Sequence, residues 1–257
     1  MSRWRASFIH LLISLVIVGS VAACIIYFWY PPALLHMAKA DRLLILIGGV
    51  DLVVGPLLTL IVYKANKRHL KFDLAIIGLI QVVFLAYGLY TIWNSRPVFL
   101  VAVPDRFELV FANEITPKRL AEAKIERFKT LSFGKPILVG AQMPKDPKEQ
   151  EAILFSAVRG QGDIQNTPKY FVDYSLVSTS LLKHAKPLTG KTMSNSEAAV
   201  LQHAALSYGY KSSELRYLPL ASSRNFAVIL VKADTGEVVG PVNIDPQTDN
   251  LRHTLPR

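Results

Sequence analysis

A single carboxylate, Asp51, lies in the middle of an otherwise uncharged apolar segment. An ionised side chain at the centre of a bilayer costs about 2.5–3.5 kcal/mol on insertion scales, so such a residue usually faces protein or water instead of lipid. Gln81 occupies a comparable place in the next apolar segment, and we expect it to donate a hydrogen bond to Asp51 if the two segments pack side by side. The candidate contact residues on and beside these helix faces are Asp51, Gly48, Gly55, Pro56, Thr59 and Gln81.

Three interpretations of this polar set remain open. Its small and polar residues hold the helices of one bundle together, or they line a groove that receives the transmembrane helix of another protein. A third interpretation is proton or ion transfer, although no second acidic residue lies at the same depth. Pro56 is expected to bend its helix, because proline removes a backbone hydrogen bond and crowds the preceding turn. A bend beside Gly55 would widen a groove.

The rest of the chain offers no pattern for covalent or metal chemistry. It contains no serine-hydrolase elbow, zinc-protease helix, Walker loop or dinucleotide fingerprint. His184, His203 and His253 are far apart in sequence and lack the spacing of metal ligands. An intramembrane aspartyl protease needs two carboxylates that share a proton, and Asp51 stands alone. We therefore expect a protein that is not an enzyme and needs no cofactor.

Three apolar segments, residues 8–30, 43–63 and 74–93, must position these residues. Each has about the 20 residues that cross a hydrocarbon core about 30 Å thick. Residues 1–93 are therefore predicted to form a three-span membrane domain, and residues 94–257 a separate domain of ordinary soluble composition.

The short loops predict the direction of the spans. Basic residues mark the cytoplasmic side of a membrane protein, and they gather before the first span and between the second and third, at Arg3, Arg5, Lys64, Lys67, Arg68 and Lys71. The amino terminus is therefore expected in the cytoplasm, with residues 94–257 as an extracytoplasmic domain on the other side of the membrane. Trp29 and Trp93 end the first and third spans, where indole rings favour the headgroup region.

The net charge of +10 does not indicate a nucleic-acid partner. Residues 1–93 hold 8 Lys/Arg and 3 Asp/Glu, beside apolar spans, and the remaining excess is dispersed without a basic stripe. The one cysteine, Cys24, follows a stretch that looks like a lipoprotein cleavage box. Cleavage and lipidation there is an alternative to a first span, but the apolar run continues to Tyr30, whereas a signal segment is normally shorter.

The carboxy-terminal region predicts a mixture of strands and helices without a βαβ rhythm, which is typical of the α+β class. Residues 98–103 and 107–111 read as paired strands, and residues 136–142 as another. Helices are expected from Thr116-Pro117, with Ala121, Ile125 and Phe128 as the buried face, from Asp146 to about residue 160, and from Ser194 to Gly209. Residues 226–231 and 238–244 flank Asp234-Thr235-Gly236, a strong hairpin signal.

An ordered series of short matches covers residues 30–115 and resembles the type IV pilin accessory proteins known as TfpX/TfpZ. The matching stretches are Tyr30-Pro31-Pro32, Val50-Asp51, Gly55-Pro56-Leu57-Leu58-Thr59-Leu60, Asp73-Leu74-Ala75, Gln81, Ala86-Tyr87-Gly88-Leu89-Tyr90, Arg96-Pro97-Val98 and Asp105-Arg106-Phe107. The resemblance implies an inner-membrane helper of type IV pilus biogenesis that binds and stabilises or presents pilin before assembly. The resemblance covers about half the chain and is not traced beyond about residue 130.

The implied partners are a type IV pilin, major or minor, the lipid bilayer and other inner-membrane proteins of pilus assembly. A pilin has an apolar amino-terminal helix in the membrane and a globular head outside, and a small bundle joined to an external domain is suited to engage both. Two other functions stay open: a periplasmic ligand-binding or sensory membrane protein, and a structural subunit of the pilus machine. A sensor would need a cytoplasmic signalling domain, and the predicted cytoplasmic parts are only a short amino terminus and one loop of about ten residues.

Overall fold

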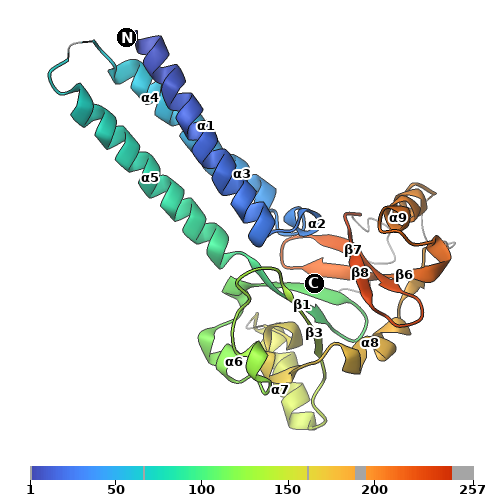
Figure 1. The fold of residues 1–257 in the computed structure, drawn as a ribbon. Helices are drawn as coiled ribbons and strands as arrows, with labels where there is room; N and C mark the ends of the chain where they lie inside the picture. Colours follow the sequence, from blue (N-terminus) through green and yellow to red (C-terminus); the bar gives the residue numbers. More distant parts are fainter. Residues whose placement is uncertain (1, 66, 161, 189–194, 245–257) are drawn as a thin grey trace.

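Three long helices project from one end of a mixed β-sheet (Figure 1). The computed structural model describes residues 2–65, 67–160, 162–188 and 195–244. Helix α1 (Arg3–Phe28), a middle helix over Ala40–Val62 and α5 (Leu70–Asn94) are long and apolar enough to span a membrane. Few of their residues are buried inside the chain, so lipid or another protein must cover the rest. The chain is a membrane protein with a carboxy-terminal α+β domain.

The middle span is not a continuous α-helix. It consists of α3 (Ala40–Gly49), a π-helical turn η1 (Val50–Val54) and α4 (Gly55–Val62). Pro56 is the second residue of α4. Proline cannot donate to the preceding turn and its ring crowds that turn, and a wider π-turn is one way for a helix to accommodate it. The sequence predicts a bend at Pro56, and the structure has a π-helical turn around Asp51, just before this proline.

The described part of the sheet domain contains β1 (Pro97–Ala102), β2 (Phe107–Phe111), β3 (Ile137–Ala141), β4 (Phe171–Val172), β5 (Lys186–Pro187), β6 (Leu215–Ser222), β7 (Phe226–Lys232) and β8 (Val238–Val242). Its α-helices are α6 (Pro117–Ala121), α7 (Pro147–Val158), α8 (Ser175–Leu182) and α9 (Asn195–Ser207), and a short helix α2 (Pro32–Leu35) joins the first two spans. Single 3-10 turns are η2 (Ala112–Glu114), η3 (Glu126–Phe128), η4 (Ile164–Asn166), η5 (Pro168–Tyr170) and η6 (Ser212–Glu214).

The strands form one mixed sheet in the order β4-β3-β1-β2-β6-β7-β8, with β5 beside β6. The predicted β1–β2 and β7–β8 hairpins are confirmed as antiparallel pairs, and Gly236 adopts φ +72° in the second turn. Two parallel pairs, β1 with β3 and β2 with β6, join the hairpins into one sheet. The β2–β6 pairing is short, from Phe107 opposite Leu220 to Leu109 opposite Ser222.

One predicted helix is shorter than expected. The helix capped by Thr116 ends at Ala121, so Ile125 and Phe128 do not continue its buried face. Ala123 and Phe128 instead lie in the core between the sheet and its loops, where Phe128 packs edge-on against Phe171. Tertiary packing has overridden the local helical pattern here.

The loop between the first two spans is built into the core of the sheet domain. Tyr30, Leu34 and Met37 are buried in the same hydrophobic cluster as Phe107 of β2 and Leu220 of β6. This loop and the sheet therefore lie at one end of the spans, while the amino terminus and the loop between the second and third spans lie at the other (Figure 1). That arrangement agrees with three crossings.

Two polar side chains tie this junction together. The Nη1 of Arg224, in the β6–β7 turn, donates to the main-chain oxygens of Ala38 (3.1 Å) and Ser95 (3.2 Å), at the ends of two different spans. The hydroxyl of Tyr30 donates to the oxygen of Ile92 at 3.1 Å, and burial raises the pKa of Tyr30 to about 12. The sheet domain thus contacts the spans at several points besides its covalent link.

Candidate functional site

Asp51 lies within the π-helical turn of the middle span, with only 4% of its surface exposed. Its Oδ1 atom is buried and has no hydrogen-bond partner among the residues that the structure describes. Buried polar groups are usually paired, so this carboxyl is an exception that needs an explanation.

A histidine links the three spans next to Asp51. His10 Nδ1 lies 2.6 Å from Thr59 Oγ1, and His10 Nε2 lies 2.6 Å from Gln81 Oε1. The Gln81 amide nitrogen donates to the main-chain oxygen of Asp51 at 3.1 Å, so the amide oxygen accepts from His10 Nε2. In the tautomer that carries its proton on Nε2, Nδ1 accepts from the Thr59 hydroxyl. Asp51 joins this network through its main-chain oxygen, and its Oδ1 atom stays unpaired.

The other predicted contact residues face this chain's own helices. A Cβ at Gly48 would lie 3.0 Å from Val18 of α1, and a Cβ at Gly55 would overlap the amide of Gln81. Thr59 is buried, and the main-chain oxygen of Pro56 accepts from Ser7 of α1 at 2.8 Å. The structure therefore brings the predicted set together, with Gln81 beside Asp51 as expected. Among them, Asp51 and Gln81 line a cavity.

Sequence reasoning missed His10. The prediction of the first span rests on the absence of Asp, Glu, Lys and Arg from residues 8–30, and this criterion does not single out a histidine. The available signal was a row of polar residues at helical spacing, Ser7, His10 and Ser14, on one face of that segment. A polar row inside a span usually faces protein, and here it faces the middle span and α5.

Two cavities lie between α1 and α5. The first has a volume of about 200 Å³ and is lined by His10, Ser14, Asp51 and Gln81 together with apolar residues of both helices. The second, of about 430 Å³, lies at the end nearer the sheet and is almost wholly apolar, lined by Ser20, Val21, Cys24, Ile25, Phe28, Trp29, Leu89 and Phe133. We call the face that carries both cavities the α1–α5 groove. It offers an apolar surface along two spans, with the polar residues His10, Asp51 and Gln81 at one end.

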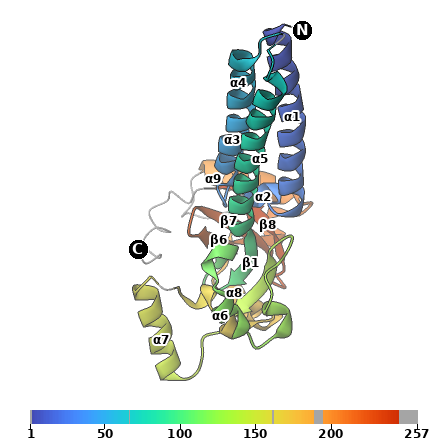
Figure 2. The same ribbon diagram turned by 90° about the vertical axis from the view of Figure 1, so that its left-hand side faces the viewer.

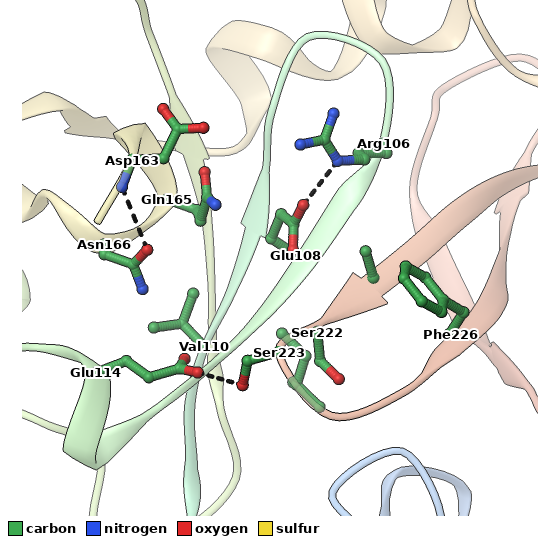
Figure 3. Close-up of a pocket in the computed structure, with 12 residues that line it drawn as sticks. Arg106, Glu108, Val110, Glu114, Asp163, Gln165, Asn166, Ser222, Ser223 and Phe226 are labelled. Atoms are coloured by element: carbon green, nitrogen blue, oxygen red, sulfur yellow. Dashed lines mark hydrogen bonds and ion pairs between the residues drawn. The ribbon is translucent and has the colours of Figure 1, made fainter. Parts of the chain in front are cut away.

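The sheet domain has a polar cavity of about 270 Å³ where β2 and β6 meet (Figure 3). Arg106 Nε donates to Glu108 Oε1 at 2.6 Å, and burial raises the pKa of the Glu108 carboxyl against the opposing charge of Arg106. Glu114 accepts from the main-chain nitrogen of Phe111 (2.9 Å) and from the Ser223 hydroxyl, which closes the edge of β2 beyond its pairing with β6. These charged groups are engaged in holding the sheet together.

Metal ligation has no support in the described residues. No group of three or more His, Cys, Asp or Glu side chains is placed there to hold a metal ion. The arrangement of the α1–α5 groove is suited instead to bind an apolar helix and to donate or accept hydrogen bonds at membrane depth.

Comparison with known proteins places the chain among proteins of fimbrial assembly. The family model described as fimbrial assembly protein FimB matches residues 1–32. The fimbrial assembly protein of Dichelobacter nodosus serogroups C1 and C2 is 33% identical over 121 residues, and the match covers 92% of that protein and 46% of this chain. The chain belongs to the fimbrial assembly protein family.

Longer relatives extend this likeness over nearly the whole chain. The fimbrial assembly proteins of D. nodosus serogroups I and E1 are each 29% identical, over 245 and 250 residues, covering 94% of this chain and 95% of each relative. No solved structure matches the chain significantly. A role in pilus biogenesis follows for this fimbrial assembly protein.

Proposed function

We propose that this protein is an accessory of type IV pilus biogenesis that binds pilin subunits and stabilises or presents them before assembly. Support comes from the relatives named for fimbrial assembly and from the stretches that resemble TfpX/TfpZ pilin accessory proteins. The role is one of binding and needs no covalent step. It requires a membrane surface that holds the apolar helix of a pilin, and the α1–α5 groove has the required character.

The observation that carries the proposal is Asp51, which lines the cavity between α1 and α5 and has one carboxyl oxygen without a hydrogen-bond partner among the described residues. A buried acceptor without a donor costs about 1–3 kcal/mol, and lipid tails offer no donor. A guest helix with an N–H or O–H group at this depth supplies that donor. The same helix covers the apolar surface of the groove, which extends from Asp51 toward Trp29.

The proposed location is the bacterial inner membrane, with the amino terminus in the cytoplasm and the sheet domain in the periplasm. Basic residues gather at the end of the spans far from the sheet, which favours that end as cytoplasmic. A pilin held in the groove then has its globular head beside the sheet domain. Other inner-membrane proteins of pilus assembly are proposed to receive the subunit from this complex.

Deletion of the gene, followed by immunoblotting of unassembled pilin, tests this function. We expect the pool of membrane-embedded pilin to fall and to return with the wild-type protein, while Asp51→Leu restores it poorly. Glu151→Leu, which removes an exposed carboxylate on α7, is the matched control and should restore it fully. An unchanged pilin pool, together with no pilin in a pull-down of the tagged protein, would contradict the proposal.

A further inference from the structure

A short loop of the sheet domain, residues 131–135, lies against the ends of two spans. Arg96, just after α5, donates from Nε to the main-chain oxygen of Ser132 at 3.1 Å, and Ser132 Oγ donates to the oxygen of Lys135 at 2.6 Å. A Cβ at Gly134 would lie 3.5 Å from the main-chain oxygen of Phe28 in α1. The loop is therefore held in a defined position at the membrane end of the domain.

The side chain of Phe133 projects outward from this loop. The residue is 68% exposed, although the centroid of its ring lies 5.3 Å from that of Trp93, which in turn lies 5.0 Å from that of Trp29. Arg96 stacks over the Trp93 ring at 3.5 Å. A phenylalanine from the sheet domain thus extends a row of aromatic rings that begins at the ends of α1 and α5.

We propose that Phe133 inserts into the boundary between headgroups and acyl chains of the leaflet next to the sheet domain. The occupant is lipid because the ring continues the exposed apolar surface of the spans: Phe28, at the end of α1, is half exposed and lines the same cavity as Phe133. Aromatic rings concentrate at this depth of a bilayer. The inference concerns the protein without a guest helix in the α1–α5 groove, because Phe133 also lines the apolar cavity of that groove.

Insertion of Phe133 gives the sheet domain a second attachment to the bilayer. The domain is already joined to the ends of the spans by hydrogen bonds from Arg96 to Trp93 and from Arg224 to Ala38 and Ser95. A further contact, with lipid, fixes the tilt of the domain relative to the membrane. Phe133 also closes one end of the apolar cavity that Cys24 and Leu89 line.

A nitroxide scan of the purified full chain tests the proposal. Cys24→Ser removes the native thiol, and Phe133→Cys or Phe155→Cys then carries the spin label in vesicles of phosphatidylethanolamine and phosphatidylglycerol. Phe155 is the matched control, because it is half exposed on α7, at the end of the domain away from the spans (Figure 2). Relaxation by oxygen, which enters lipid, is compared with relaxation by a water-soluble nickel chelate.

The label at position 133 is expected to relax at least several-fold more with oxygen, relative to the nickel chelate, than the label at position 155. Equal ratios at the two positions would show that Phe133 lies in water and would overturn the proposal. Low accessibility of position 133 to both reagents would show a protein contact, which overturns it as well. Wild-type-like melting of each labelled variant confirms that these exposed positions tolerate the change.

Discussion

At the scale of single residues, the polar centre of the bundle lacks one hydrogen-bond donor, the one that Asp51 Oδ1 would need. His10 joins Thr59 and Gln81, and Gln81 joins the main chain of Asp51, so the spans are linked without the Asp51 carboxyl. Sequence reasoning predicts that Asp51 and Gln81 come together, because each stands out in an apolar span. The sequence does not show which oxygen of Asp51 accepts the hydrogen bond from Gln81, the main-chain or a side-chain oxygen. That depends on the π-helical turn, which the sequence does not predict.

Replacement of Asp51 by leucine is expected to stabilise the isolated protein while weakening pilin binding. Removing an unpaired buried acceptor should raise the free energy of unfolding by about 1–3 kcal/mol, and the adjoining cavity has room for the larger side chain. Thermal melting in detergent measures the change. A lower melting temperature for Asp51→Leu would mean that the carboxyl is already satisfied within the chain.

Replacement of His10 by alanine should have the opposite effect on stability. Two hydrogen bonds are lost, and the buried Thr59 and the half-buried Gln81 each lose a partner, which should cost about 1–2 kcal/mol. Ser14→Ala, one turn along the same face, removes a hydroxyl with no such bonds and should change little. Unfolding in mixed detergent micelles compares the two variants. Equal stabilities would show that the histidine is not a link.

The pH dependence of stability should report on Glu108. Burial raises the pKa of this carboxyl in the folded protein, so the stability that it contributes is fully present below its unfolded value and is lost as pH rises through the folded value. Glu108→Gln cannot ionise, and its stability relative to wild type should therefore be highest at neutral pH and fall toward pH 5. Chemical denaturation at both pH values tests this. A trend of the opposite sign would mean that Arg106 dominates and lowers the pKa.

At the scale of elements, what the sequence can predict depends on how local the signal is. The three spans and the β1–β2 and β7–β8 hairpins follow from apolar length and turn residues, and they are confirmed. Strand β6 escapes sequence reasoning, because Pro219 argues against a central strand. The proline is tolerated because it lies between the residues of β6 that pair with β5 and those that pair with β2. This position without a partner on that side of β6 is visible only in the assembled sheet.

The junction between α2 and the β6–β7 turn is expected to depend on Arg224. Its guanidinium donates to Ala38 and Ser95 and stacks 3.7 Å from the ring of Phe111, so Arg224→Ala should destabilise the protein by about 2–3 kcal/mol. Arg159→Ala, at an exposed site after α7, is the matched control. Limited proteolysis between the first two spans should increase for Arg224→Ala only. An unchanged cleavage pattern would contradict this role.

At the scale of the whole molecule, the spans and the sheet domain share a core. Tyr30 and Met37 belong to the membrane-proximal loop, yet they are buried with Phe107 of β2. The sequence shows that this loop is apolar but not where it packs, because its partners lie more than 60 residues away. The shared core holds the α1–α5 groove and the sheet in one fixed relation, which the proposed binding of both the helix and the head of a pilin would require.

Disulfide trapping of pilin in living cells tests the central claim most directly. Val82 and Val83 are adjacent on α5 and similarly exposed, but only Val82 lines the cavity with Asp51. In a Cys24→Ser background, Val82→Cys should form a defined adduct with a cysteine in the apolar helix of pilin, and Val83→Cys should not. Adding Asp51→Leu should abolish the adduct. Equal trapping at both positions, or none at Val82 while pilin still copurifies, would contradict binding in the groove.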